Sequence, residues 1–160
     1  MSFHVKFLPS SAPDGAGVLD EDEPIDDPMT FAIEVCPVLE DLGVGFVAGG
    51  FGEERWPVDV ATDLATIVPQ LRDLIAALGA GAPGMLEFFE QGIERRVSFT
   101  PQGDTVELHC ESWGGWRPPT PVEHADLGAT RAMLTDLAVG FSREVARLLP
   151  ALAGSPYLPA

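Results

Sequence analysis

Apolar residues recur at every third or fourth position in two stretches of the chain, which predicts two long amphipathic helices. The first helix is expected over residues 62–78, with a kink or a later start because Pro69 has no backbone donor. The second is expected over residues 127–149. Its N-cap is either Asp126 or the capping-box pattern of residues 120–123, because both place a side-chain oxygen before the first apolar turn.

Shorter stretches are apolar or alternate between apolar and polar residues, as strands with a buried face do. The strands expected from these patterns cover residues 3–8, 30–36, 44–51, 85–89, 94–100 and 104–110. The clearest feature is a hairpin of the last two, whose inward side chains are expected to be Val97, Phe99, Val106, Leu108 and Cys110. The strands follow one another as hairpins, so we expect an α+β, two-layer fold with a mostly antiparallel sheet and two main helices packed on one face.

The chain length of 160 residues predicts a single domain over residues 1–160. Residues 10–29 are rich in acids and prolines, which is typical of an acidic loop or a disordered segment. Residues 151–160 are expected to form a loose C-terminal tail. The sequence shows neither a signal-peptide pattern nor an apolar run long enough to span a membrane, so we expect a cytoplasmic protein.

Charge narrows the range of partners, because 25 acidic residues stand against nine basic ones and give a formal net charge of −16. Such a surface repels the phosphates of nucleic acids and of anionic membranes. It suits a basic protein partner, and it also keeps a protein soluble without any partner. We therefore expect neither nucleic acid nor a membrane as a partner.

The sequence offers no pattern of catalytic or metal-binding residues. It lacks a Gly-x-Ser-x-Gly nucleophile motif, a zinc-type spacing of cysteines and histidines, and a phosphate-binding glycine loop. His4, His109 and His124 fall in separate predicted elements. Cys36 and Cys110 are expected to be free thiols in a reducing cytosol, with a disulfide as the alternative. We expect a protein that is not an enzyme and that uses no metal or cofactor.

Residues 112–121 read SWGGWRPPTP and carry two of the three tryptophans. A Gly-Gly pair suits a two-residue turn, so we expect Trp113 and Trp116 to pair across a hairpin tip at the end of the sheet. There they either close the edge of the core or, with Arg117, form an anchor for a partner, since tryptophan and arginine are enriched at binding hot spots. The residues expected to contact a partner are Trp113, Trp116, Arg117, Trp56, Glu53, Glu54, Arg55, Arg96, Glu107, His109 and Glu111.

The order of several segments resembles that of a known group of proteins. After the early strands come DLATIVPQLRDLIAALGAG, FFEQGIERRVSF, GDTVELHCES, a tryptophan-containing loop and LTDLAVGFSREVARLLP. This layout resembles the small acidic α+β proteins of actinobacteria, a group that includes immunity proteins of polymorphic toxin systems. The resemblance covers residues 30–150 and implies a non-enzymatic protein that binds and blocks a cognate toxin.

Three functions stay open at this point. The first is a protein-binding module, whose sharpest form is an immunity-type protein that neutralises a basic toxin or effector. The second is a domain that binds a small molecule or a peptide in a pocket lined by tryptophans. The third is a structural subunit that self-associates, for example as a homodimer, through an exposed sheet edge.

Overall fold

Three helices and two antiparallel sheets make up the fold in a computed structural model, which describes residues 2–20, 24–89 and 93–160. The four-stranded sheet has the strand order β3–β4–β5–β6, and β1 pairs with β2 in a separate sheet. The elements are β1 (His4–Leu8), α1 (Pro28–Asp41), β2 (Gly45–Gly49), a π-helical turn (Val60–Leu64), α2 (Ala65–Gly79), β3 (Gly84–Phe88), β4 (Arg95–Gln102), β5 (Thr105–Ser112), β6 (Val122–Asp126), α3 (Leu127–Leu148) and a 3-10 turn (Pro150–Leu152). The expected α+β class is confirmed.

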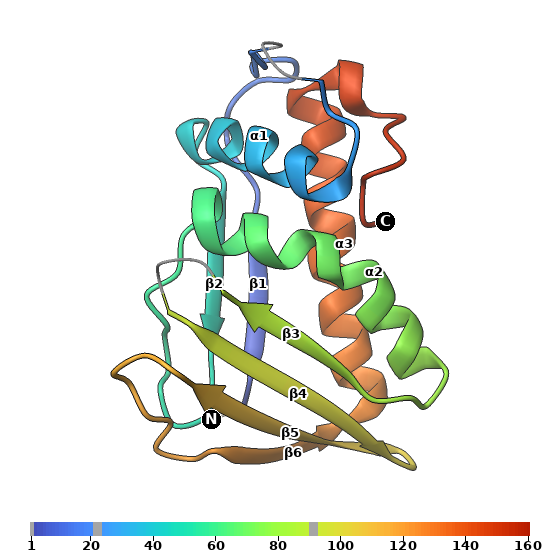
Figure 1. Ribbon diagram of the computed structural model, residues 1–160. Coiled ribbons are helices and arrows are strands. Elements are labelled where there is room, and N and C mark those ends of the chain that lie inside the picture. Colours follow the sequence, from blue (N-terminus) through green and yellow to red (C-terminus); the bar gives the residue numbers. More distant parts are fainter. Residues whose placement is uncertain (1, 21–23, 90–92) are drawn as a thin grey trace.

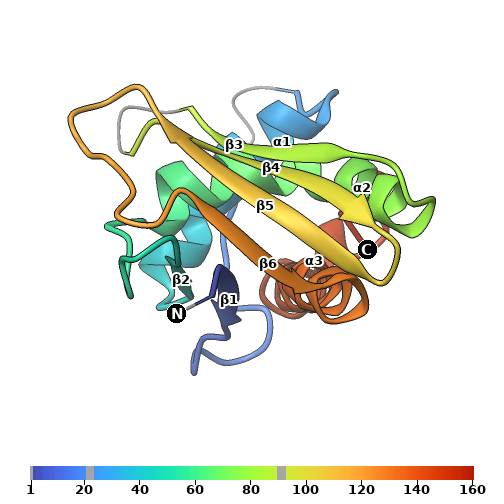
Figure 2. The same cartoon turned by 90° about the horizontal axis from the view of Figure 1, so that it is seen from below.

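Helices α2 and α3 pack on one face of the four-stranded sheet, and α1 packs against α2 and the π-helical turn. The described part of the chain leaves the other face of the sheet open (Figures 1 and 2). β4 and β5 form the predicted hairpin, in which Val97 lies opposite Cys110 and Phe99 lies opposite Leu108. These inward side chains are buried. The prediction succeeds here because successive side chains of a strand point to opposite faces of the sheet.

Residues 30–36, which we expected to form a strand, lie instead in α1, a third helix beside the two that were predicted. Ile33 shows the error, because alternation placed it on the buried face and it is 52% exposed. Asp27 caps the helix and Pro28 occupies its first turn, and both favour a helix over a strand. The buried residues of α1 follow a helical period and are Phe31, Ala32, Val35, Cys36 and Leu39.

The tryptophan segment does not end the sheet, because β6 follows it. Residues 113–121 form a long connection between β5 and β6, so the expected two-residue hairpin turn is wrong. The pairing of β6 with β5 also rules out the capping box at residues 120–123. The other predicted N-cap is confirmed, since the Asp126 carboxylate accepts a hydrogen bond from the Ala129 backbone N–H at 2.7 Å.

Helix α2 follows a π-helical turn that the sequence pattern did not indicate. The cap of this turn is Asp59, which precedes the predicted helix, and its carboxylate accepts a hydrogen bond from the Thr62 backbone N–H at 2.7 Å. Pro69 lies inside α2, where it removes one backbone donor. The helix ends at Gly79, close to the predicted end.

A glycine-rich turn follows β2 and packs against the 113–121 connection. Gly52 has a φ angle of 91°, and a Cβ atom added there would lie 2.7 Å from Cβ of Pro119. Glu123 of β6 holds this turn and the start of β1 together, because its two carboxylate oxygens accept the backbone N–H groups of Phe3 and Phe51 at 2.5 Å each. One side chain thus links the two sheets.

Within the predicted acidic segment 10–29, residues 10–17 are held against the end of α3, residues 28 and 29 begin α1, and residues 21–23 lie outside the described residues. The Arg147 guanidinium donates to the carbonyls of Ser10 at 3.0 Å and Ala12 at 2.6 Å. The Gly17 backbone N–H donates to the carbonyl of Leu148 at 2.9 Å. These hydrogen bonds hold a segment that buries little apolar surface of its own.

The C-terminal residues 151–160, which we expected to be loose, contact all three helices. Leu158 is 7% exposed, and its carbonyl accepts a hydrogen bond from the Arg72 guanidinium of α2. The Ala160 backbone N–H donates to the Ser142 hydroxyl of α3 at 3.1 Å. The Tyr157 ring lies 6.1 Å from that of Phe31 in α1. The tail differs from the expectation because a buried leucine, this ring contact and two polar contacts hold a segment whose sequence has no periodic pattern.

Candidate functional site

The two tryptophans of the 113–121 connection lie in different environments. Trp113 follows β5 and is 49% exposed, with the guanidinium carbon of Arg96 at 5.8 Å from its ring centre. Trp116 is half-buried and packs against the core. The sequence left open whether this pair belongs to the core or forms an exposed anchor. The structure assigns a core contact to Trp116 and an exposed position to Trp113.

Trp116 covers a buried arginine that was not among the predicted site residues. The guanidinium carbon of Arg95 lies 3.6 Å from the centre of the Trp116 ring and 4.7 Å from that of Trp56. The Arg95 side chain is 4% exposed, and its Nη2 atom lies 3.7 Å from a carboxylate oxygen of Glu53. Burial lowers the pKa of Arg95, while the carboxylate of Glu53 acts in the opposite direction. The two aromatic faces stabilise the cation where water is excluded.

The cluster around Arg95 corrects the role expected for Trp56. Trp56 is 2% exposed, and its indole N–H donates to the Gly50 carbonyl at 3.2 Å, so it cannot contact a partner directly. Arg95 was not among the predicted site residues. Strand alternation does indicate that it is buried, because Arg95 shares the inward face of β4 with Val97 and Phe99. A cation at an inward position is itself a signal, since buried charges need specific partners.

The uncovered face of the four-stranded sheet brings together four of the residues predicted to bind a partner, Arg96, Glu107, His109 and Glu111. Two of them, His109 and Glu111, are neighbours, with the His109 Nδ1 atom 3.5 Å from the Glu111 carboxylate. The open sheet face consists of Met85, Glu87, Arg96, Ser98, Glu107, His109, Glu111, Val122 and His124, with Trp113 at its end.

Charges on the open sheet face are paired across neighbouring strands. The Arg96 Nε atom donates to the Glu87 carboxylate at 2.8 Å, between β4 and β3. The His124 Nε2 atom lies 3.3 Å from the Glu107 carboxylate, between β6 and β5. Cross-strand pairs of this kind contribute about 0.2–1 kcal/mol each, so they order the side chains without removing them from solvent.

The other predicted contact residues lie on loops rather than on this face. Glu54 and Arg55 are exposed in the turn after β2, whereas the neighbouring Glu53 carboxylate is directed at the buried arginine. Arg117 is exposed, and its Nη1 atom donates to the carbonyls of Gly114 at 2.7 Å and Trp116 at 3.0 Å. Arg117 therefore stabilises its own loop.

A groove that the sequence did not indicate runs between β1 and α3. Its volume is about 700 Å³, within the range of ligand-binding clefts. No tryptophan lines it, so it is not the tryptophan-lined pocket that we expected for a small-molecule binder. Its apolar wall is formed by Val5, Phe7, Ala132, Met133, Leu137 and Gly140.

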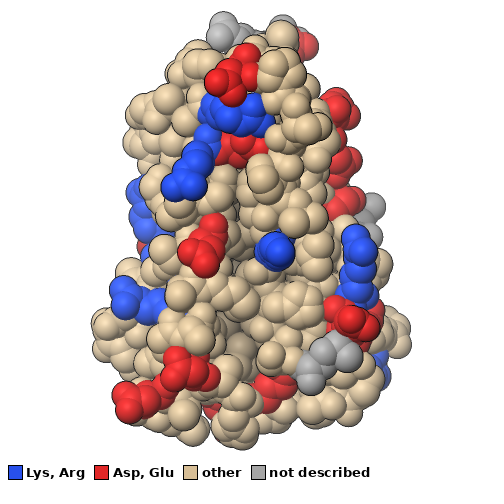
Figure 3. All heavy atoms as spheres, turned by 180° about the vertical axis from the view of Figure 1, so that it is seen from behind, with Lys and Arg blue, Asp and Glu red and all other residues tan. Residues whose placement is uncertain are grey.

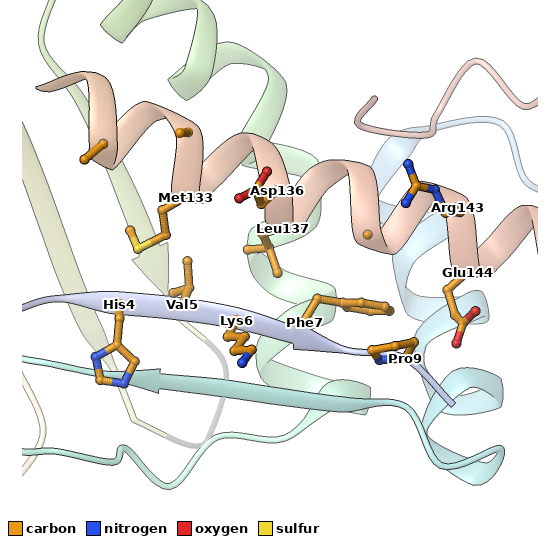
Figure 4. Close-up of a pocket in the computed structure, with 13 residues that line it drawn as sticks. His4, Val5, Lys6, Phe7, Pro9, Met133, Asp136, Leu137, Arg143 and Glu144 are labelled. Carbon is orange, nitrogen blue, oxygen red and sulfur yellow. The ribbon is translucent and has the colours of Figure 1, made fainter. Parts of the chain in front are cut away.

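The two faces of β1 differ at this groove. Val5 and Phe7 point toward α3, near Met133 and Leu137, while His4 and Lys6 point away from the helix (Figure 4). The rings of Phe7 and Phe141 are 6.4 Å apart in an edge-to-face arrangement, which anchors this end of the strand to the helix. Figure 3 shows the side of the molecule that carries α3 and β1, where separate basic and acidic groups, one of each near the centre, are scattered over a largely uncharged surface.

Both cysteines are buried free thiols, so neither is available as a nucleophile. Cys36 in α1 is 0% exposed and Cys110 in β5 is 2% exposed. Burial raises the pKa of both thiols, that of Cys110 to about 12. The reactive thiolate is therefore scarce at neutral pH.

Within residues 2–20, 24–89 and 93–160, no group of three or more histidine, cysteine or acidic side chains is arranged to hold a metal ion. None of the helices in these ranges is long and apolar enough to cross a membrane. Comparison with protein-family models, with curated proteins and with solved structures finds no match to this chain.

Proposed function

We propose that this protein is a non-enzymatic binding module whose open sheet face recognises a basic protein. The observation that carries the proposal is Trp113, which is 49% exposed beside Arg96 at the end of a sheet face that no helix of the described residues covers (Figure 2). Tryptophan and arginine dominate binding hot spots because they combine a large contact area with a directed polar group. An exposed tryptophan without a partner leaves apolar area in water that binding would remove.

Exposed apolar side chains surround these charges on the open sheet face. Met85 is 48% exposed on β3, and Val122 is 40% exposed on β6, at the opposite edge of the sheet. Phe89, directly after β3, is 44% exposed. Protein interfaces combine apolar contacts with a polar rim, and the open sheet face supplies both kinds of group.

The charge of the open sheet face favours a basic partner. It carries the carboxylates of Glu87, Glu107 and Glu111 and the guanidinium of Arg96. The chain as a whole has a net charge of −16, which attracts a positively charged surface over long distances and makes the association salt-dependent. Neutralisation of a basic toxin or effector is the sharpest form of this function, because a nuclease must present a basic cleft to bind phosphates.

The test is a capture experiment from the native cell lysate at about 50 mM and about 300 mM salt, because screening separates charge-driven binding from other contacts. Three proteins serve as bait: wild type, Trp113→Ala, and the matched control Ile33→Ala, which removes an apolar side chain of similar exposure from α1. A second pair compares Glu111→Lys with Asp41→Lys, both exposed. Circular dichroism verifies that each variant is folded.

The proposal expects one basic protein to be retained by wild type and by both controls at low salt, and to be lost with Trp113→Ala and with Glu111→Lys. Co-expression then tests neutralisation, since the captured protein should arrest growth alone and with Trp113→Ala, but not with wild type. If Trp113→Ala and Glu111→Lys capture the basic protein as well as wild type does, the open sheet face is not its binding site. Wild type that elutes as a dimer, dissociated by Trp113→Ala, would instead make this face a contact between two copies of the chain.

A further inference from the structure

β1 has one paired edge and one free edge. It pairs with β2 along one side, from His4 opposite Gly49 to Leu8 opposite Gly45. Apart from this ladder, the backbone of β1 makes no hydrogen bond to another described residue. In an antiparallel pair, every second residue directs its N–H and C=O away from the partner strand. The outer edge of β1 therefore presents unpaired donors and acceptors.

This free edge borders the groove between β1 and α3. The consecutive residues 4–7 all line the groove, although their side chains alternate between the two faces of the strand. A cavity over one face of a strand would be lined by alternate residues only. The groove thus lies beside the strand, where an added strand would take its place.

We propose that the groove binds an extended peptide that pairs with the free edge of β1, and that apolar residues alternate with acidic residues in this peptide. Directly opposite residues in neighbouring strands share one face of the sheet. The faces of β1 therefore dictate the faces of the added strand. Peptide residues opposite Val5 and Phe7 contact the apolar wall of the groove. Peptide residues opposite His4 and Lys6 lie on the face of the strand that points away from α3.

The charge of β1 selects the acidic residues of the peptide. Lys6 is the only lysine in the chain, it is exposed, and it makes no ion pair with another described residue. A carboxylate opposite Lys6 completes a cross-strand ion pair of the kind that the open sheet face already contains. A basic residue at the same position would face Lys6 and be repelled.

The charged residues that α3 contributes to the groove do not oppose this arrangement. Asp136 and Arg143 point away from β1 (Figure 4). Glu144 is already occupied, because its carboxylate accepts hydrogen bonds from the Arg147 guanidinium at 2.6 Å and from the Ser10 backbone N–H at 2.5 Å. What α3 presents to the peptide is its apolar side, with Met133 and Leu137.

The test uses fluorescein-labelled peptides of about six residues, because a strand of that length spans the groove at roughly 3.3 Å per residue. The first probe alternates valine with glutamate, and the second replaces each glutamate by lysine. A third contains the residues of the first in a non-alternating order, and a fourth carries N-methyl groups on alternate amides of the first, in two registers. Fluorescence anisotropy measures affinity, and hydrogen exchange followed by NMR measures protection of the amides of β1.

The proposal expects saturable binding of the alternating glutamate peptide, with new protection of amides in β1, and weak binding of the scrambled peptide. The two N-methylated peptides carry the methyl groups on opposite sets of alternate amides. The one that lacks the N–H groups facing β1 is expected not to bind, because those groups donate the hydrogen bonds to the strand edge. Lys6→Glu weakens binding of the glutamate peptide roughly fivefold to tenfold and strengthens binding of the lysine peptide, since one cross-strand charge pair is reversed.

Ala132→Phe, which fills the groove from an exposed position on α3, abolishes binding, whereas Ala76→Phe on the exposed side of α2 leaves it unchanged. The proposal is overturned if no alternating peptide binds saturably, or if binding survives both Ala132→Phe and both registers of N-methylation. It is also overturned if decanoate, an apolar chain with one carboxylate, binds in the groove and the peptides do not. The open sheet face is separate, so Trp113→Ala leaves peptide binding intact whatever the fate of the proposed function.

Discussion

Arg95 places a positive charge between two aromatic rings in the interior, and its truncation tests what the charge contributes. Arg95→Ala leaves a cavity beside Trp116 and removes the cation facing Glu53, so we expect the free energy of unfolding to fall by about 3–5 kcal/mol. Arg95→Met keeps most of the volume, and because Glu53 can turn toward solvent, the expected loss is about 1 kcal/mol. Urea denaturation followed by circular dichroism measures both.

Arg96→Met is the matched control for Arg95, since it removes the neighbouring, partly exposed guanidinium and should lower the free energy of unfolding by less than about 1 kcal/mol. Equal losses for Arg95→Met and Arg95→Ala would mean that the charge, rather than the packing of the side chain, provides the stability.

The different environments of the two loop tryptophans predict different effects on stability. Trp116→Ala uncovers Arg95 and removes the edge-to-face contact with Trp56 at 6.1 Å, so we expect a loss of about 2 kcal/mol. Trp113→Ala removes an exposed ring and should change the free energy of unfolding by less than about 0.5 kcal/mol. The same denaturation experiment compares the two, and a larger loss for Trp113→Ala would contradict its assignment as a surface residue.

Single residues could be placed from the sequence where strand alternation applies, and not where a loop is involved. The inward positions of the β4–β5 hairpin followed from alternation alone, and the same rule indicates Arg95. Trp113 and Trp116 could not be placed, because their environments depend on the path of the 113–121 connection. That path is set by distant contacts such as the packing of Pro119 against Gly52.

At the scale of elements, the first helix depends on its cap. The Asp27 carboxylate accepts hydrogen bonds from the backbone N–H and the hydroxyl of Thr30, each at 2.7 Å. We expect Asp27→Ala to destabilise the protein by about 1 kcal/mol and Asp27→Asn to cost only a few tenths, because asparagine is an equally good N-cap. Thermal denaturation separates the two variants. Similar losses for both would show that the charge of Asp27 matters more than the cap.

Helix α1 and strand β6 could not be predicted from local sequence patterns. The pattern of α1 is ambiguous, and in β6 the apolar residue is exposed while a charged residue faces inward. The run at residues 30–36 fits both a strand period and a helix period, so only Asp27 and Pro28 distinguish the two. In β6, the apolar Val122 is exposed and the acidic Glu123 faces inward, where it accepts hydrogen bonds from two loop N–H groups. Alternation cannot reveal a strand whose inward residue is a carboxylate serving other segments.

At the scale of the whole molecule, acid should loosen the contact between the N-terminal segment and α3. The hydrogen bond from Arg147 lowers the pKa of Glu144 below its ordinary value of 4.5, with a further contribution from the Ser10 backbone N–H, while burial and, to a smaller extent, Asp14 act in the opposite direction. A carboxyl group whose pKa is lower in the folded state stabilises the protein above pH 4.5, and this contribution disappears as the pH falls through the folded pKa.

Glu144→Gln therefore lowers stability near neutral pH, and its difference from wild type shrinks as the pH falls below 4.5. Urea denaturation at a series of pH values follows this difference, with the exposed Glu54→Gln as the control. A difference that stays constant down to strongly acidic pH would contradict the role of the ionised Glu144.

The groove between β1 and α3 is a property of the whole fold and has no counterpart in the sequence pattern. Its walls come from residues 4–9 and 129–144, at opposite ends of the chain. The sequence indicated both elements, the edge strand and the last helix, but the distance between them depends on Glu123 and Phe7 holding β1 in place. The open sheet face needed less information, because one hairpin supplies most of its predicted residues.

Because both thiols are buried, their rates of labelling report how often two separate parts of the molecule, α1 and β5, open. A thiol reagent can reach Cys36 only when α1 detaches, and Cys110 only when β5 is uncovered. The labelling rates of the two cysteines then give the opening free energy of each layer under native conditions. Equal rates would describe a molecule that opens as one unit, and faster labelling of Cys36 would describe a helical layer that opens while the sheet persists.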